Sequence, residues 1–297
     1  MQLARNRTPL RYPGGKQRLT PFVKKVLERN NLLGAEYAEP YAGGAGVAIE
    51  LLLSNCVSKI HLNDANQGVY AFWHSILNHT EDFCRRIVSA SMTVTEWRRH
   101  KAIVDAPDGA DRLDLGFSTF ILNRTNRSGI QSAGVIGGLK QDGEWKMDAR
   151  FPRNDLIHRI EAIALQKSRI RIRNWDAEKY IKQYIPRLPQ ASLVYFDPPY
   201  FNKADRLYLH HYKPSDHQRI AKQIQENVFQ PWIVSYDQTT EIIDHYRERN
   251  RVEYDLQYNA SESYTGREVM FFSDELAIPE LDLLSNPTCE LVTAYTR

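Results

Sequence analysis

The sequence predicts an α/β protein with a mostly parallel, Rossmann-like sheet and a long, mostly helical insertion. Short apolar segments alternate with helical patterns towards both ends of the chain, an order that builds parallel sheets. The segment 67–168 contains helical patterns and glycine-rich loop but no strand pattern. Several predicted strands end in an acidic residue or a glycine-rich bend, and open α/β sheets bind ligands at those strand ends.

The composition is typical of a folded intracellular protein. Its 297 residues are 42% hydrophobic, enough for one large α/β domain with an insertion or for two domains. The net charge of +3 does not by itself identify a nucleic-acid-binding protein. The three cysteines lack metal-ligand spacing, which favours a reducing compartment over a disulfide or zinc framework. No secretory signal or bilayer-spanning segment is visible, so we expect a soluble, cytoplasmic protein.

Each predicted element is placed by its own periodicity. Strand patterns lie at 59–63, 169–176, 192–196, 232–236, 252–258 and 269–273. The last two suit an antiparallel edge that completes the sheet. Helical patterns lie at 21–30, 47–54, 68–79, 81–91, 95–105, 113–126, 155–167, 177–187, 216–227 and 240–249.

The strand at 192–196 ends abruptly in Asp197-Pro198-Pro199-Tyr200. Because each proline lacks an N–H and fixes φ, the carbonyls of Asp197 and Pro198 can remain rigid acceptors beside the carboxylate. Two acceptors and the ring of Tyr200 suit a planar group that carries an NH2. The alternative is a proline-rich turn in which Asp197 is only a turn former.

A glycine-rich bend at 39–46 leads from an apolar segment into a helical one and would let a ligand approach the backbone. The next strand ends in Asp64, where nucleoside cofactors have their ribose hydroxyls bound. The alternative is an ordinary loop between strand and helix. Ile49 stands where a dinucleotide fingerprint requires glycine or alanine, which disfavours NAD or FAD.

The N-terminal turn Pro13-Gly14-Gly15 is flanked by Tyr12 and Lys16, which could hold a charged ligand with an aromatic part. Its spacing is not that of a nucleotide P-loop, and a purely structural turn explains it equally well.

The middle of the insertion is rich in hydrogen-bond donors that could enter a DNA groove. These are Arg124, Asn126, Arg127, Lys140, Lys146 and Arg150, with Trp145 among them. Asp142-Gly143 predicts a hairpin there. The alternative is a charged, solvated surface loop.

Together these motifs resemble those of the Dam-type (D12 class) adenine-N6 DNA methyltransferases. The resemblance is carried, in the family's order, by 13–16, 39–46, 63–64 and 197–200. It implies a methyltransferase sheet formed by 1–66 and 169–297 that binds S-adenosylmethionine. It also implies a target-recognition domain at 67–168 that binds double-stranded DNA.

The resemblance also assigns roles to individual residues. The catalytic residues, which hold the adenine, would be Asp197, Pro198, Pro199 and Tyr200. The cofactor-binding residues would be Tyr12, Lys16, Tyr41, Gly43, Gly44, Gly46, Asp64, Asp176 and Asp197. We expect no metal and no membrane partner. The protein would act in the cytoplasm at the nucleoid, as a monomer on DNA or as a subunit of a restriction-modification or defence system.

The chain departs from the family pattern at three places. Tyr12 stands where the family often has tryptophan, and Ala45 stands where its second glycine is expected. After Asn123-Arg124-Thr125 the family commonly continues Cys-Phe-Asn-Gly, whereas this chain has 126–129 as Asn-Arg-Ser-Gly. No target sequence is therefore carried over.

Three other functions remain open at this point. The methyl acceptor could be another planar amine, such as cytosine N4, an RNA adenine or a protein glutamine. The chain could also be a catalytically silent DNA-binding subunit of a larger complex, or a nicotinamide-dependent dehydrogenase, which the glycine spacing disfavours.

Overall fold

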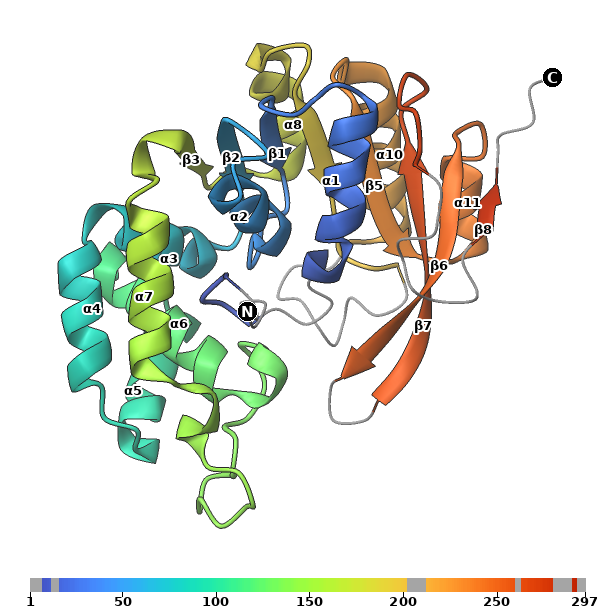
Figure 1. The fold of residues 1–297 in the computed structure, drawn as a ribbon. Helices are drawn as coiled ribbons and strands as arrows, with labels where there is room; N and C mark the ends of the chain where they lie inside the picture. The colour runs from blue at the N-terminus through green and yellow to red at the C-terminus, as the bar shows by residue number, and fades with distance from the viewer. Residues whose placement is uncertain (1–6, 12–15, 202–211, 260–262, 280–289, 293–297) are drawn as a thin grey trace.

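The computed structural model describes residues 7–11, 16–201, 212–259, 263–279 and 290–292. In these ranges one eight-stranded sheet has the order β3-β2-β1-β4-β5-β7-β6-β8 (Figure 1). The strands are β1 (Glu36–Glu39), β2 (Lys59–Asn63), β3 (Ile170–Arg173), β4 (Leu193–Phe196), β5 (Trp232–Asp237), β6 (Arg251–Asn259), β7 (Ser263–Phe272) and β8 (Glu290–Val292). β1 to β5 run parallel, and β7 pairs antiparallel with β5 and β6. The predicted Rossmann-like sheet with an antiparallel edge is confirmed.

The helices occupy most of the predicted positions. They are α1 (Thr20–Arg29), α2 (Gly46–Leu53), α3 (Gln67–Asn78), α4 (Thr80–Ser89), α5 (Val94–Asp105), α6 (Arg112–Thr125), α7 (Arg153–Ala164), α8 (Ala177–Gln183), α10 (Pro214–Asn227) and α11 (Thr240–His245). Side-chain caps explain where several begin. Asn66 accepts a hydrogen bond from the N–H of Val69 at α3, and Asp111 accepts two at the start of α6.

Several predictions differ from the structure, among them the bounds of β3, which ends at Arg173 rather than 176, and of β7, which begins at Ser263 rather than 269. The helix expected at 177–187 ends at Gln183 and continues as a 3-10 turn, because Pro186 has no N–H for the helical ladder. α11 ends at His245 rather than at 249. The hairpin predicted at Asp142-Gly143 is wrong, since the segment folds as consecutive turns with an isolated bridge between Asn126 and Val135.

The central strands are buried on both faces, as is usual for parallel sheets. Leu193 and Tyr195 of β4 belong to a hydrophobic cluster that includes α1, α2 and most of the insertion. Val194 and Phe196 alternate with them and belong to a second cluster, with α8, α10 and α11. This double burial fixes β4 rigidly and so fixes the position of the residues that follow it.

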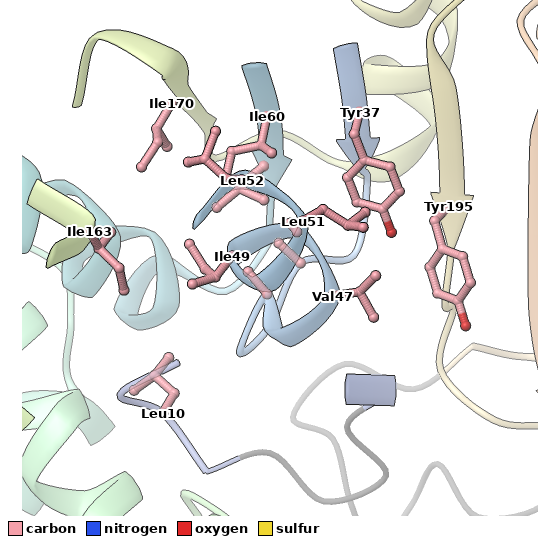
Figure 2. Packing of buried hydrophobic residues seen from close by; sticks show 14 of the residues in the cluster. Leu10, Tyr37, Val47, Ile49, Leu51, Leu52, Ile60, Ile163, Ile170 and Tyr195 are labelled. Atoms are coloured by element: carbon pink, nitrogen blue, oxygen red, sulfur yellow. The ribbon is translucent and has the colours of Figure 1, made fainter. Parts of the chain in front are cut away.

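The insertion α3 to α7 lies beside the β3 edge of the sheet (Figure 1). Stacked and edge-on contacts join the rings of Phe72, Phe83 and Phe120 inside it. These rings belong to the same cluster as Ile49 on α2 and Ile60 on β2, which are labelled in Figure 2. The insertion thus shares its core with the sheet, and its separate role as a recognition domain at 67–168 stays a prediction. No helix in the described part of the chain is long and apolar enough to span a bilayer.

Candidate active site

Three acidic side chains lie at the edge of the sheet that is formed by the carboxyl ends of the parallel strands. β1 pairs with β2 on one side and with β4 on the other, so three acids lie at the carboxyl ends of adjacent parallel strands: Glu39 as the last residue of β1, Asp64 after β2 and Asp197 after β4. Ligands of open α/β sheets bind at this edge. The topology thus places the glycine-rich bend, Asp64 and Asp197 next to one another, as the sequence predicted.

The glycine-rich bend is tied directly to Asp64. The N–H of Gly43 donates to Asp64 Oδ2 at 2.8 Å, and the N–H of Asn66 donates to Oδ1 at 2.9 Å. Gly43 has a φ of 45°, a conformation that glycine adopts without strain. Ala45 has a φ of 45° as well, so the left-handed geometry is kept where the expected glycine is absent.

Glu39 also stabilises the glycine-rich bend. Its Oε1 accepts hydrogen bonds from the Tyr37 hydroxyl at 3.1 Å and from the Ala48 N–H in the first turn of α2 at 3.0 Å. Burial raises the pKa of Glu39 to about 8, against the opposing effect of these two bonds. The carboxyl therefore acts as an internal clamp between the end of β1 and α2.

Asp197 is held on one side only. Its Oδ1 accepts a hydrogen bond from Ser235 Oγ at 2.8 Å and lies 3.5 Å from Lys16 Nζ. The Tyr195 hydroxyl in turn donates to Ser235 at 3.0 Å. Within the described residues no group donates to Oδ2, and 24% of the side-chain surface is exposed. Burial raises the pKa of Asp197 to about 6, which Lys16 and Ser235 oppose.

The rest of the tetrapeptide is anchored to neighbouring strands. Among the described residues no backbone N–H donates to the carbonyl of Pro198. The N–H of Phe201 donates to Asp237 Oδ1 at the end of β5, at 2.8 Å. The chain after β4 is therefore fixed at both ends, with Asp197 Oδ2 and the Pro198 carbonyl as remaining acceptors.

Tyr200 belongs to a buried polar network. Its hydroxyl donates to Glu268 Oε1 at 2.6 Å and accepts from Lys16 Nζ at 2.7 Å. Lys16 also donates to Glu268 Oε2 at 2.6 Å, and Tyr254 donates to the same oxygen at 2.7 Å. Only 2% of Tyr200 is exposed, and the Lys16 ammonium lies 4.9 Å from its ring centroid. Stacking of this ring on an adenine, as predicted, therefore requires the ammonium to move.

A comparison with known protein families covers the part of the chain that carries these motifs. The family model of the D12 class N6 adenine-specific DNA methyltransferases matches residues 12–260 of this chain. The chain belongs to this family. Membership makes S-adenosylmethionine the cofactor, because it is the methyl donor of such enzymes.

The likeness to curated proteins and to solved structures is absent or distant. No curated protein matches the chain. The solved structures that resemble it include TrmN from Thermus thermophilus, with 10% identity, a TM-score of 0.37 and coverage of 86% of this chain and 49% of that one. They also include the rRNA methyltransferase aviRa from Streptomyces viridochromogenes, with 11% identity, a TM-score of 0.36 and coverage of 89% and 87%. This chain thus spans about half the length of the Thermus protein.

The predicted cofactor residues of this D12 member fall into two groups. Gly43 and Asp64 form the contact described above, and Tyr41 lies beside them with its hydroxyl 3.0 Å from that of Tyr212. Gly44 accepts a hydrogen bond from Thr8, and a side chain at Gly46 would stand 3.1 Å from Gln17 Cβ. The latter two positions thus have packing roles.

Asp176 is the N-cap of α8. Its Oδ1 accepts hydrogen bonds from the N–H groups of Glu178 and Lys179. The neighbouring Asn174 donates to the carbonyl of Asp64 at 2.8 Å, so the loop after β3 does reach the candidate site. The structure gives Asp176 a capping role, and a cofactor contact by this residue stays a prediction.

Two of the predicted DNA-binding residues are corrected by the structure. Arg124 is buried, and it donates to the carbonyls of Arg150 and Pro9. Burial lowers the pKa of Arg124 to about 9. Asn126 is fully buried and binds Trp97 Nε1. Both lie at the end of α6, whose last turns are buried all round, so their polar groups are used inside the protein.

The other four candidates, Arg127, Lys140, Lys146 and Arg150, are exposed. They surround the loop of turns between α6 and α7, where Trp145 is 63% exposed. Tyr12 and the turn 13–15 lie outside the described residues. Ser235, Asp237 and Glu268 were not predicted, because their partners are distant in the chain and strand periodicity does not mark them.

Proposed function

We propose that this D12 family member transfers a methyl group to N6 of an adenine flipped out of double-stranded DNA. The observation that supports this most directly is the state of Asp197. One carboxylate oxygen is held by Ser235, while the other receives no hydrogen bond from the residues described. The description of the family, which names adenine N6 and DNA, points to the same chemistry.

The free acceptors suit the amino group of adenine. Its N6 lone pair is delocalised into the ring and is a poor nucleophile. Asp197 Oδ2 would accept one N6 hydrogen and the Pro198 carbonyl the other, which draws the nitrogen towards tetrahedral geometry. Because both acceptors are fixed before the substrate arrives, they stabilise the charge that develops on N6 in the transition state.

The reaction needs no covalent intermediate on the protein. The N6 lone pair forms a bond to the methyl carbon while the bond from that carbon to the sulfonium sulfur breaks, and sulfur keeps the electron pair. One N6 hydrogen leaves as a proton, which Asp197 would pass to water. Cys56 and Cys84, which are free thiols, have no part in this scheme.

The bend at β1 fits the cofactor implied by the family. An acidic residue aimed at a glycine-rich bend, with the ring of Tyr41 beside it, offers acceptors for ribose hydroxyls and a surface for a base. We assign Gly43, Asp64 and Tyr41 to this role. When bound there, S-adenosylmethionine supplies the electrophilic methyl group.

An adenine inside a duplex cannot reach Asp197, so the proposal includes base flipping, which costs a few kcal/mol. Phosphate contacts from Arg127, Lys140, Lys146 and Arg150 would offset this cost, since all four side chains are exposed. The exposed indole of Trp145 stands among them and offers a face for a nucleotide base.

The decisive experiment follows the methyl group to a single atom. The protein is incubated with tritiated S-adenosylmethionine and unmethylated genomic DNA, with RNA in a parallel reaction, and the products are digested and separated as nucleosides. We expect label in N6-methyl-2′-deoxyadenosine. Label confined to methylated cytidine, to RNA or to protein, or no label at all, would contradict the proposal.

A further inference from the structure

Glu268 lies at the centre of the polar network beside the catalytic tetrapeptide. It is on β7, far from every sequence motif, and only 1% of its side chain is exposed. It accepts hydrogen bonds from Lys16, Tyr200 and Tyr254 at 2.6 to 2.7 Å. Tyr254 is its direct cross-strand partner on β6, so the β6–β7 hairpin fixes the carboxylate in place.

We propose that Glu268 is a positioning residue for methyl transfer, which draws the Lys16 ammonium away from Asp197 and anchors the Tyr200 hydroxyl. This inference rests on the function proposed above. It names a residue outside the motifs and gives it a defined effect on the reacting carboxylate.

The distances show how the ammonium is shared. Lys16 Nζ lies 2.6 Å from Glu268 but 3.5 Å from Asp197 Oδ1. An ammonium in direct contact with Asp197 would occupy lone pairs that the adenine amino group needs. Because Glu268 binds it more closely, the carboxylate of Asp197 keeps an acceptor for the substrate. A buried ammonium without Glu268 would have Asp197 as its nearest remaining carboxylate.

The same arrangement sets the charge at Asp197. The titratable and hydrogen-bonding groups that act on it from the surrounding elements are Lys16 before α1, Glu39 and Tyr37 on β1, Tyr195 on β4, Ser235 and Tyr236 on β5, and Glu268 on β7. Burial raises the pKa of Asp197 most, Lys16 opposes this, and Glu268 adds to it. Burial also raises the pKa of Tyr195 and of Tyr254, so these hydroxyls stay neutral.

Two substitutions should therefore have opposite effects on the pH profile. Glu268→Gln removes a repelling charge and releases Lys16 towards Asp197, so the acid limb of the single-turnover rate moves to lower pH. Lys16→Met removes the attracting charge and moves it to higher pH. Each shift should be on the order of half a unit to one unit. Glu268→Gln should also lower the plateau rate roughly tenfold, because Asp197 and Tyr200 lose their fixed positions.

Glu253→Gln is the matched control. It makes the same chemical change one residue from Tyr254, on the opposite face of β6, where Glu253 binds Arg251 and Gln238. Its rate and acid limb should equal those of the wild type. If Glu268→Gln does not fold, Tyr254→Phe replaces it as the test variant, because it removes one hydrogen bond to Glu268. It should lower the plateau rate in the same direction but by less.

A readout without catalysis completes the test. A double-mutant cycle of Lys16→Met and Glu268→Gln, measured by urea unfolding, should show strongly non-additive effects. If the wild type is active but the two variants share the same acid limb, the positioning role of Glu268 is refuted. An additive cycle refutes it as well. Neither result refutes the proposed function. A wild type that methylates no DNA overturns the proposed function, and the positioning role with it.

Discussion

Asp197 combines two properties that usually exclude each other in a carboxylate. It is fixed by the hydrogen bond from Ser235, yet its second oxygen receives no bond within the described residues. In Asp64, by contrast, both oxygens accept backbone hydrogen bonds, one from Gly43 and one from Asn66. Asp197 therefore keeps one oxygen for the proposed chemistry, whereas the hydrogen bonds of Asp64 support the bend.

Replacing Asp197 by alanine tests the chemistry at its centre. We expect Asp197→Ala to lower the rate of methyl transfer by a factor of about 100 or more, because the N6 hydrogens lose a preorganised acceptor. Affinity for DNA, measured by fluorescence anisotropy, should change by less than about threefold, since phosphate contacts supply most of it. Full activity in this variant would refute the assignment.

The pH dependence follows from the pKa of Asp197, which is about 6. The carboxylate must be ionised to accept the N6 hydrogens, so the rate should be constant above this pH and fall about tenfold per unit below it. Because the pKa in the folded state is raised, protonation of Asp197 favours the fold. Circular dichroism should therefore show a folded protein at pH 5, where single-turnover activity has already fallen about tenfold; unfolding in step with that fall would speak against this origin.

The elements were predictable where one pattern determines them. Strand patterns placed β2, β6 and the last part of β7, and the apolar helical spacing placed α3 to α7. Burial of polar residues was not predictable in the same way. α6 is buried around its last turns, and Arg124 satisfies its donors with carbonyls of the chain segments beside it. No local pattern distinguishes such an arginine from one that awaits a phosphate.

Arg124 and Arg127 provide a matched pair at this element. Arg124→Ala should lower the free energy of unfolding by roughly 2 to 3 kcal/mol, because it leaves buried carbonyls without donors. Arg127→Ala should leave stability nearly unchanged but weaken DNA binding and reduce its salt dependence by about one counterion. Urea unfolding and salt-dependent anisotropy measure the two effects. Equal stability losses in both variants would contradict the distinction.

At the scale of the whole molecule, strand order brings the site together. The sequence showed acids at the ends of several strands, and the parallel order β2-β1-β4 makes Asp64, Glu39 and Asp197 neighbours. The sequence could not show what the antiparallel strands contribute to the candidate site. Glu268 lies one residue before the strand predicted at 269–273, and its burial follows only from the packing of β7 between β5 and β6.

Cofactor binding should be visible in the stability of the whole protein. A ligand at 100 times its Kd stabilises the native state by about 2.7 kcal/mol. S-adenosylmethionine at that level should raise the melting temperature by roughly 5 °C or more, without DNA. NADH at the same concentration should cause no shift, and a shift with NADH alone would instead favour a dehydrogenase.

The bond between Lys16 and Glu268 joins residues 252 positions apart. A chain still emerging from the ribosome can form the bend at β1 and the capped helices of the insertion long before Glu268 has been synthesised. Until then Lys16 has Asp197 as its only carboxylate partner in the network, and the tetrapeptide lacks its anchor. The carboxylate that binds Lys16 more closely than Asp197 does is therefore added only when β7 has been synthesised.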